Sequence, residues 1–305
     1  MPSVVLTEHP SAVNIVDDFV TQAKRAHEVG VEQVWLSQRF DHDAIALAGI
    51  LGALVPGLKV GTFVVPINPR HPLIVSSLAQ TAQAATRGNF TLGLGLGAHQ
   101  LERQAFGTPF PNTIGRLREH LTVLRSIFDT GAVDFHGEEV TASPGEWPVT
   151  VPGATSIPVY VAAMGPKALQ VTGELADGTL PYLAGPRTIA EFIEPTIAKA
   201  AADAGRPRPH IIAAVPVLVT DDVEAGRAVA AERLGFYEAI PSYRKVLDRE
   251  GVDHAADLAA VGSAESVAKQ LRQYLDAGAT DVVLSPIDRT DTADRDSLWA
   301  VAASL

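Results

Sequence analysis

Short apolar segments alternate with segments of helical periodicity along the whole chain of 305 residues, and this alternation restricts the fold more than any other feature. Some apolar segments, such as Phe63-Val64-Val65 and the run from Ile211 to Val215, are apolar on both faces. Strands of a parallel sheet that are covered on both sides require this pattern. The sequence therefore predicts parallel strands separated by helices.

The periodicities predict eight strands, which are expected at residues 4–6, 34–37, 59–67, 90–95, 158–162, 178–181, 210–219 and 281–285. Helices are expected at 13–29, 44–54, 73–86, 115–130, 166–175, 188–204, 223–238, 263–277 and 297–303. Thr188 and Glu191 have the spacing of a capping box, so a helix is expected to begin there.

Eight strands, each followed by helical material, predict a (β/α)8 or TIM barrel. The alternative is a doubly wound open sheet, because Gly93-x-Gly95-x-x-Ala98 superficially fits its dinucleotide fingerprint. This run falls at the fourth strand, and the proline-containing segment 109–113 interrupts the path to the next helix, so the barrel is favoured. No repeat or linker divides the chain, and residues 1–305 are expected to form a single domain.

Composition and charge argue against several classes of binding partner. The net charge of −11 argues against nucleic acid or an anionic membrane as the main partner. No apolar run reaches the ~18 residues needed to span a bilayer. Without cysteine, disulfides and thiolate metal sites are excluded, and the scattered histidines predict no metal site. We expect a cytoplasmic enzyme.

Thr91 to His99 is a strand that loses its side chains as it ends. Glycines at alternate positions, with Gly95 and Gly97 last, leave main chain that a large ligand can approach closely. His99 and further polar residues follow directly. This arrangement suits a flat cofactor.

The other strand ends carry amides, glycine and apolar groups. They offer neither paired carboxylates nor a Gly-x-Ser-x-Gly elbow, which suggests that a cofactor performs the reaction. Pro166 suits the first position of a helix, and Gly165 leaves amides free to meet an anion such as a cofactor phosphate. The alternative is an ordinary strand-to-helix turn.

Several motifs together resemble the luciferase-like family of flavin and deazaflavin enzymes, and more narrowly its branch that uses coenzyme F420. They are Val34-Trp35-Leu36-Ser37-Gln38, Gly61 to Pro66 with His71-Pro72, Leu92 to Gly97, Gly115 to Leu121, Phe135 to Glu138, Pro158 to Pro166 and Gly173 to Gly178. The resemblance implies a ring-bearing cofactor stacked over a bulged third strand, with a non-prolyl cis peptide at Thr62–Phe63. It also implies a homodimer.

The cofactor-binding residues implied by this resemblance are Gln38, Thr62, Phe63, Val65, Gly95, Gly97, His99, Met164, Gly165 and Pro166. Some relatives carry an Asp-His pair where this chain has Gln38 and Arg39, and Ala98 stands where some carry a glutamate base. Gln38 retains an amide that can donate to a ring. His99 is the best titratable candidate for a proton donor. The family's insertion after strand seven looks contracted.

These observations predict an oxidoreductase that transfers a hydride between F420 and a small organic substrate, with His99 and Gln38 as candidate catalytic groups. Two alternatives stay open. One is a luciferase-like monooxygenase that uses flavin mononucleotide (FMN). The other is a non-catalytic paralogue that only binds the cofactor.

Overall fold

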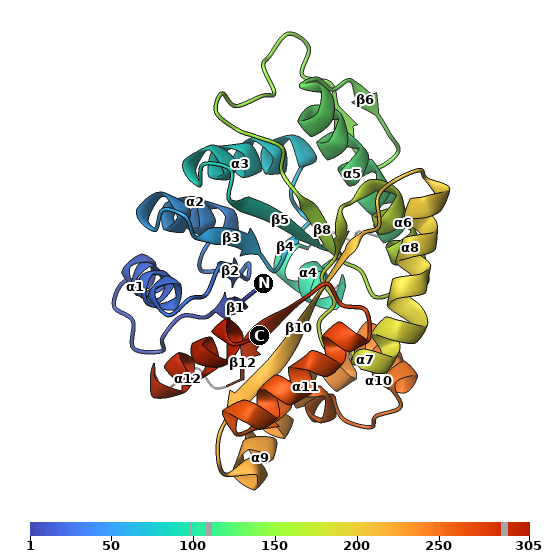
Figure 1. Ribbon diagram of the computed structural model, residues 1–305. Coiled ribbons are helices and arrows are strands. Elements are labelled where there is room, and N and C mark those ends of the chain that lie inside the picture. Colours follow the sequence, from blue (N-terminus) through green and yellow to red (C-terminus); the bar gives the residue numbers. More distant parts are fainter. Residues whose placement is uncertain (98, 108–111, 288–291) are drawn as a thin grey trace. The chain divides into compact units, whose positions relative to one another are not determined.

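A computed structural model describes residues 1–97, 99–107, 112–287 and 292–305 of the chain (Figure 1). The fold is the (β/α)8 barrel that the alternating sequence predicts, so the fold class is confirmed. Two compact units make up the chain. The first comprises Met1–Trp35, Leu180–Ala198 and His210–Leu305, and the second comprises Leu36–Thr179 and Lys199–Pro209. The expectation of a single domain stays a prediction.

The second unit contains every residue that the sequence singled out for the cofactor. Its parallel strands follow the order β3, β5, β8, β9, and β4 pairs with β5. The strands are β3 (Lys59–Thr62), β4 (Val65–Pro66), β5 (Phe90–Gly95), β8 (Val159–Ala162) and β9 (Gly178–Thr179). The helices are α2 (Ala44–Leu54), α3 (Pro72–Ala85), α4 (His99–Phe106), α5 (Thr113–Thr130) and α6 (Pro166–Leu175).

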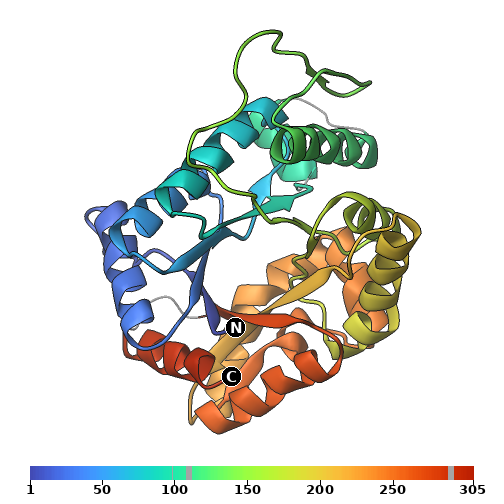
Figure 2. The same ribbon diagram turned by 45° about the horizontal axis from the view of Figure 1, so that its top comes forward.

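A short antiparallel hairpin, β6 (Phe135–His136) and β7 (Thr141–Ala142), rises beyond α3 and α5 in Figure 2. Glu119 of α5 holds it, because its carboxylate accepts hydrogen bonds of 2.8–2.9 Å from the amides of residues 138, 139 and 140. Asp177 has a similar role beside β8. It accepts from the amide of Val159 and forms ion pairs with Arg125 and Arg206. Glu119 and Asp177, which belong to two of the sequence motifs, therefore have structural roles.

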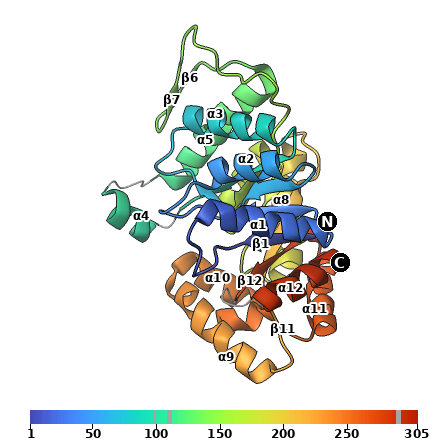
Figure 3. The ribbon, with the colours of Figure 1, turned by 90° about the vertical axis from the view of Figure 1, so that its left-hand side faces the viewer.

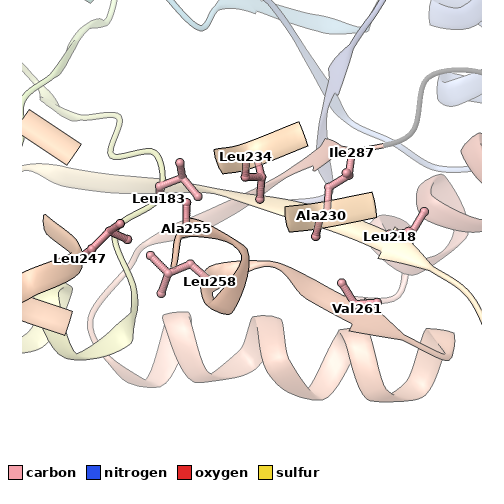
Figure 4. Packing of buried hydrophobic residues seen from close by; sticks show 9 residues of the cluster. All are labelled: Leu183, Leu218, Ala230, Leu234, Leu247, Ala255, Leu258, Val261 and Ile287. Carbon is pink, nitrogen blue, oxygen red and sulfur yellow. The ribbon is translucent and has the colours of Figure 1, made fainter. Parts of the chain in front are cut away.

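The strands of the first unit follow the order β11, β10, β12, β1, β2. They are β1 (Ser3–Leu6), β2 (Gln33–Leu36), β10 (His210–Val219), β11 (Ala260–Gly262) and β12 (Asp281–Pro286). Its helical segments include α1 (Ile15–Glu28), α7 (Pro186–Thr188), α9 (Val223–Leu234), α10 (Pro241–Glu250), α11 (Ala264–Asp276) and α12 (Thr292–Ala303). Helix α8 (Glu194–Asp203) begins in the first unit and ends in the second. A cluster of buried aliphatic side chains, from Leu183 to Ile287, packs between β10, β11, α9 and α10 (Figure 4).

Two expectations in the first unit are wrong. The helical segment begins at Pro186, not at Thr188, because the Glu250 carboxylate accepts hydrogen bonds from the amides of Arg187 and Thr188. A distant side chain therefore caps this end in place of a local capping box. The connection from Val219 to the last strand contains β11 and α10 as well as the expected helices. No helix in the described part of the chain is long and apolar enough to cross a membrane.

Candidate active site

The carboxyl ends of β4, β5 and β8 meet at one edge of the sheet in the second unit. Pro66 pairs with Gly95, and Gly95 pairs with Ala162. The segments that follow these strands therefore start side by side. Active sites of (β/α)8 barrels form at this end of the strands. Pro66, Gly97 and Met164, all from predicted site segments, belong to this edge and are at least partly exposed.

The third barrel strand is interrupted between β3 and β4, and the peptide bond from Phe63 to Val64 is cis. The resemblance placed this bond at Thr62–Phe63, so the expected position was wrong by one residue. At the interruption, the amide of Phe63 donates to Leu36 O at 2.7 Å, and Ser37 Oγ donates to Phe63 O at 2.9 Å. These two bonds tie the interruption to the end of β2 and to the residue that follows it.

Gly95 makes room for this interruption. A Cβ atom built on Gly95 would lie 2.6 Å from Val64 Cγ2, well inside any permitted contact. The space beside Gly95 is therefore filled by a protein side chain, which corrects the expectation of bare main chain at this position. Gly97 lies beyond the strand with a φ of +78°, a conformation that favours glycine, and it is exposed.

The side chains of Thr62 and Val65 point into the protein interior. The hydroxyl of Thr62 donates to Gly93 O at 2.9 Å and accepts from Gly93 N at 2.8 Å, which ties β3 to β5. Val65 is fully buried beside its partner Leu94. The half-buried residues of this segment are Phe63 and Val64, and they present the surface that a ring could cover.

Gln38 uses its whole amide within the loop that follows β2. Its Nε2 donates to Arg39 O at 2.7 Å and to His42 O at 2.8 Å. Its Oε1 accepts from Ala44 N at 3.1 Å and from Arg70 at 3.0 Å. In this arrangement Gln38 organises the loop and has no donor left for a cofactor.

Arg70 is a partner of Gln38 that was not predicted from the sequence. Its guanidinium contacts both Gln38 Oε1 and, at 2.5 Å, the carboxylate of Asp43, which caps the start of α2. Partial burial raises the pKa of Asp43, but hydrogen bonds from Ala46 and Arg70 outweigh it, and the pKa lies below its usual value. The carboxylate stays ionised and keeps Arg70 beside the loop.

The loop that follows β2 also carries a carboxylate–imidazole pair that was not predicted from the sequence. His42 Nδ1 lies 2.9 Å from Asp41 Oδ1. Desolvation raises the pKa of Asp41, but its backbone hydrogen bond and the charges of His42 and Arg39 lower it further than desolvation raises it. The signal was the Asp41-His42 dipeptide itself, which is separated from Gln38-Arg39 by Phe40 alone.

The start of α6 is open to an anion. Gly165 is its N-cap residue; among the described residues, no side chain caps the helix and no atom lies within 4 Å of a Cβ atom built at Gly165. Pro166 occupies the first turn and is exposed, while Met164 is half-buried. The free amides at this end carry a partial positive charge, which suits a phosphate group. The residues present therefore fit the phosphate-bearing end of a cofactor.

His99, the expected proton donor, begins α4, and its side chain lies outside the part of the chain that the structure describes, as does Ala98. The role of His99 stays a prediction.

Several known proteins are similar to this chain. The family model described as luciferase-like monooxygenase matches residues 3–281. A Mycobacterium tuberculosis protein that carries the provisional name of coenzyme F420-dependent oxidoreductase is 25% identical to this chain. The match covers 85% of this chain and 88% of that protein. The 5,10-methylenetetrahydromethanopterin reductase of Methanolobus tindarius is 27% identical over 77% of this chain and 71% of its own.

Among solved structures, the F420-dependent tetrahydromethanopterin reductase of Methanopyrus kandleri matches 99% of this chain and 97% of its own, with a TM-score of 0.80 at 20% identity. This likeness shows the (β/α)8 fold. The family match extends over nearly the whole chain and includes every described site segment. The chain therefore belongs to the luciferase-like monooxygenase family.

Proposed function

We propose that this protein is an oxidoreductase that transfers a hydride between coenzyme F420 and a small organic substrate. The observation that carries the proposal is the juxtaposition, at one sheet edge, of the interrupted third strand with the ends of β5 and β8. The resemblance to F420-dependent relatives supports the choice of cofactor. F420, when bound, supplies the hydride-transferring ring.

The residues of the chain would bind and position this cofactor. Phe63 and Val64 would support the ring, and the exposed backbone at Gly97 would contact the chain that links ring and phosphate. The amides that follow Gly165 would hold the phosphate. Gln38 and Arg70 would keep the loop after β2 in place, and holding the reactants in contact is itself a large part of such catalysis.

A proton donor is needed when an acceptor is reduced, and two imidazoles are candidates. His99 stays the candidate from the sequence. His42 is a second one, because its bond to Asp41 fixes the ring at the same loop that carries Gln38. The expected cytoplasmic location is also part of this proposal.

Titration of the purified protein with oxidised F420 and with FMN tests the cofactor. We expect F420 to bind at least tenfold more tightly than FMN, as measured by quenching of cofactor fluorescence. Tighter binding of FMN would instead support the flavin monooxygenase, and failure of both to bind would refute the proposal. Reduced F420 should then be oxidised in the presence of carbonyl, imine or activated alkene substrates. If F420 binds but reduced F420 is oxidised by none of these substrates, the result would support the non-catalytic paralogue.

Two variants at one position test where the phosphate lies. Gly165 has extended backbone angles that any residue can adopt, and both Asp and Asn are good N-cap residues, so both variants should fold. Gly165→Asp places a negative charge at the start of α6 and should weaken F420 binding at least tenfold. Gly165→Asn has nearly the same size without the charge and should weaken it much less. Equal affinities for the two variants would place the phosphate elsewhere.

A further inference from the structure

Two exposed phenylalanine side chains of the second unit contact each other. Phe40 belongs to the loop that follows β2, and Phe106 is the last residue of α4, the helix that follows β5. Their ring centroids lie 5.9 Å apart and their planes meet at 69°, which makes an edge-to-face pair. Despite this contact, Phe40 is 73% exposed and Phe106 is 39% exposed. Exposed apolar side chains that adjoin one another, unlike single ones, are typical of a binding site.

The loop that carries Phe40 begins directly beside the surface proposed for the cofactor ring. The amide of Gln38 donates a hydrogen bond to Val64 O at 3.4 Å, and the amide of Phe63 donates to Leu36 O at 2.7 Å. Phe40 lies two residues beyond Gln38 in the chain. The backbone of Phe40 is therefore only two residues away from a bond to the interrupted third strand.

The side chain of Gln38 fixes the backbone from which Phe40 projects. Gln38 Nε2 donates to the carbonyl oxygens of Arg39 and His42, at 2.7 Å and 2.8 Å. The segment between these two carbonyls contains Phe40. Within the loop, only 8% of the His42 side chain is exposed, whereas most of Phe40 is. A side chain that projects from a fixed backbone loses less conformational entropy when a ligand binds to it.

Phe106 reaches Phe40 from the segment that follows β5. This strand ends at Gly95, in the middle of the sheet edge that β4, β5 and β8 form. Figure 3 shows that α4 stands apart from α2 and α3. The described side chains of α4, at residues 103–106, are all exposed, and Gly107 follows the helix with a φ of +68°. The contact between the two rings therefore connects the segment after β5 with the loop after β2.

We propose that Phe40 and Phe106, which we call the aromatic wall, determine substrate specificity, and that the substrate is an uncharged compound with an apolar group such as a phenyl ring. The third strand is bonded both to the loop that carries Phe40 and to β5, which leads to Phe106. A substrate stacked on a ring at Phe63 and Val64 would therefore meet the wall and cover its exposed apolar area, which is favourable. This substrate class rests on the proposed function, because the cofactor ring sets the place of the substrate.

Charged groups in the loop after β2 form pairs, which favours an uncharged substrate. Arg39 and Asp41, on either side of the phenylalanine, lie 3.6 Å apart. Asp43, at the end of the loop, pairs with Arg70. Two opposite charges held together offer little net attraction to an anion. Arg103 of α4 is exposed, so the experiment includes an anionic probe.

Three ketones with a common skeleton test the substrate class. Benzylacetone, butanone and levulinate share a methyl ketone and a two-carbon link, which ends in a phenyl group, a hydrogen atom and a carboxylate, respectively. Calorimetry measures their dissociation constants on the protein loaded with oxidised F420, which has no hydride to give to a ketone. We expect benzylacetone to bind at least tenfold more tightly than butanone, because its phenyl group covers the wall. Levulinate should bind no more tightly than butanone.

Substitutions in the aromatic wall should act on the preference for benzylacetone over butanone. Phe40→Ala and Phe106→Ala should each lower this preference at least fivefold, whereas Phe40→Tyr keeps the ring and should keep the preference within twofold. Trp147→Ala is the matched control, since Trp147 is an exposed aromatic residue of the same unit on another loop, and it should behave as the wild type does. Circular dichroism melting confirms that each variant is folded.

The ratio of the dissociation constants separates a specificity role from a structural one. A contact that only holds α4 against the loop would change the binding of all three ketones by the same factor, and this result would overturn the proposal. A preference of the wild type for butanone or levulinate would also overturn it. Titration with F420 distinguishes the two proposals. If the wild type does not bind F420, both fail, whereas normal F420 binding without a preference for benzylacetone refutes the aromatic wall alone.

Discussion

At the scale of single residues, Gly95 shows how one missing side chain permits the interruption of a neighbouring strand. Val64 occupies the place that a Cβ atom would take. The alternating glycines predicted a close approach at Gly95, which is correct, but they pointed to a ligand and not to a protein side chain. The identity of the approaching group depends on Val64, which is 31 residues away in the chain. No local pattern contains that information.

Gly95→Ala should therefore destabilise the protein and reduce cofactor affinity. Overpacking of this kind costs about 1–3 kcal/mol, and displacement of Val64 would also disturb the surface proposed for the ring. Urea denaturation and F420 titration measure the two effects. Gly235→Ala is the control, because a Cβ atom there meets nothing within 4 Å and the backbone is helical. Equal stability of the Gly95→Ala variant and the wild type would contradict the assignment.

His120 is a second residue whose behaviour depends on its surroundings. It is fully buried on α5, and neither ring nitrogen has a hydrogen-bond partner among the described residues. Burial first, and then the positive charges of Arg116 and His71, lower the pKa of His120 to about 3. A histidine in the unfolded chain has a pKa near 6.5. The unfolded chain therefore takes up this proton first as the pH falls.

The stability that neutral His120 contributes is complete above about pH 6.5 and is lost as the pH falls toward about 3. Between pH 7 and pH 5 the loss should be about 2 kcal/mol. His120→Leu should remove this part of the acid dependence while leaving stability at neutral pH equal or higher. Urea midpoints at the two pH values provide the measurement. His136→Leu, at an exposed histidine, should keep the wild-type dependence. If His120→Leu also keeps it, another group is responsible.

At the scale of elements, the best predictions concern segments with long, regular patterns. The limits expected for α2, β5, α6 and β10 agree with the structure or differ by no more than one residue. The ten-residue helix α10 was missed. The strands that were missed, β6, β7 and β11, are two or three residues long. Such strands are too short to show a period. Partners elsewhere in the chain hold them in place.

The β6–β7 hairpin illustrates this dependence, and Glu119 provides its test. Glu119→Ala removes the carboxylate that accepts hydrogen bonds from three backbone amides, and hydrogen bonds to charged groups contribute about 1.5–3 kcal/mol each. We expect amide exchange at residues 138–140 to become at least tenfold faster, while the core of the unit keeps its protection. Hydrogen exchange mass spectrometry measures this. Glu146→Ala, in the exposed loop nearby, should change nothing, and unchanged exchange in Glu119→Ala would contradict the role of this carboxylate.

At the scale of the whole molecule, alternating strands and helices were enough to predict a (β/α)8 barrel, and the ordered motifs were enough to predict the family. Both follow from short-range patterns that repeat along the chain.

The sequence by itself determined the fold class, the limits of the longer elements, the family and the segments that form the candidate site. Local periodicity and short motifs carry this information, because they reflect which residues each segment buries. Only the tertiary structure decided the position of the cis peptide at Phe63–Val64, the partners of the Gln38 amide and the cap that Glu250 provides. Each of these depends on atoms from residues far apart in the chain, which come together only when the strands and helices pack.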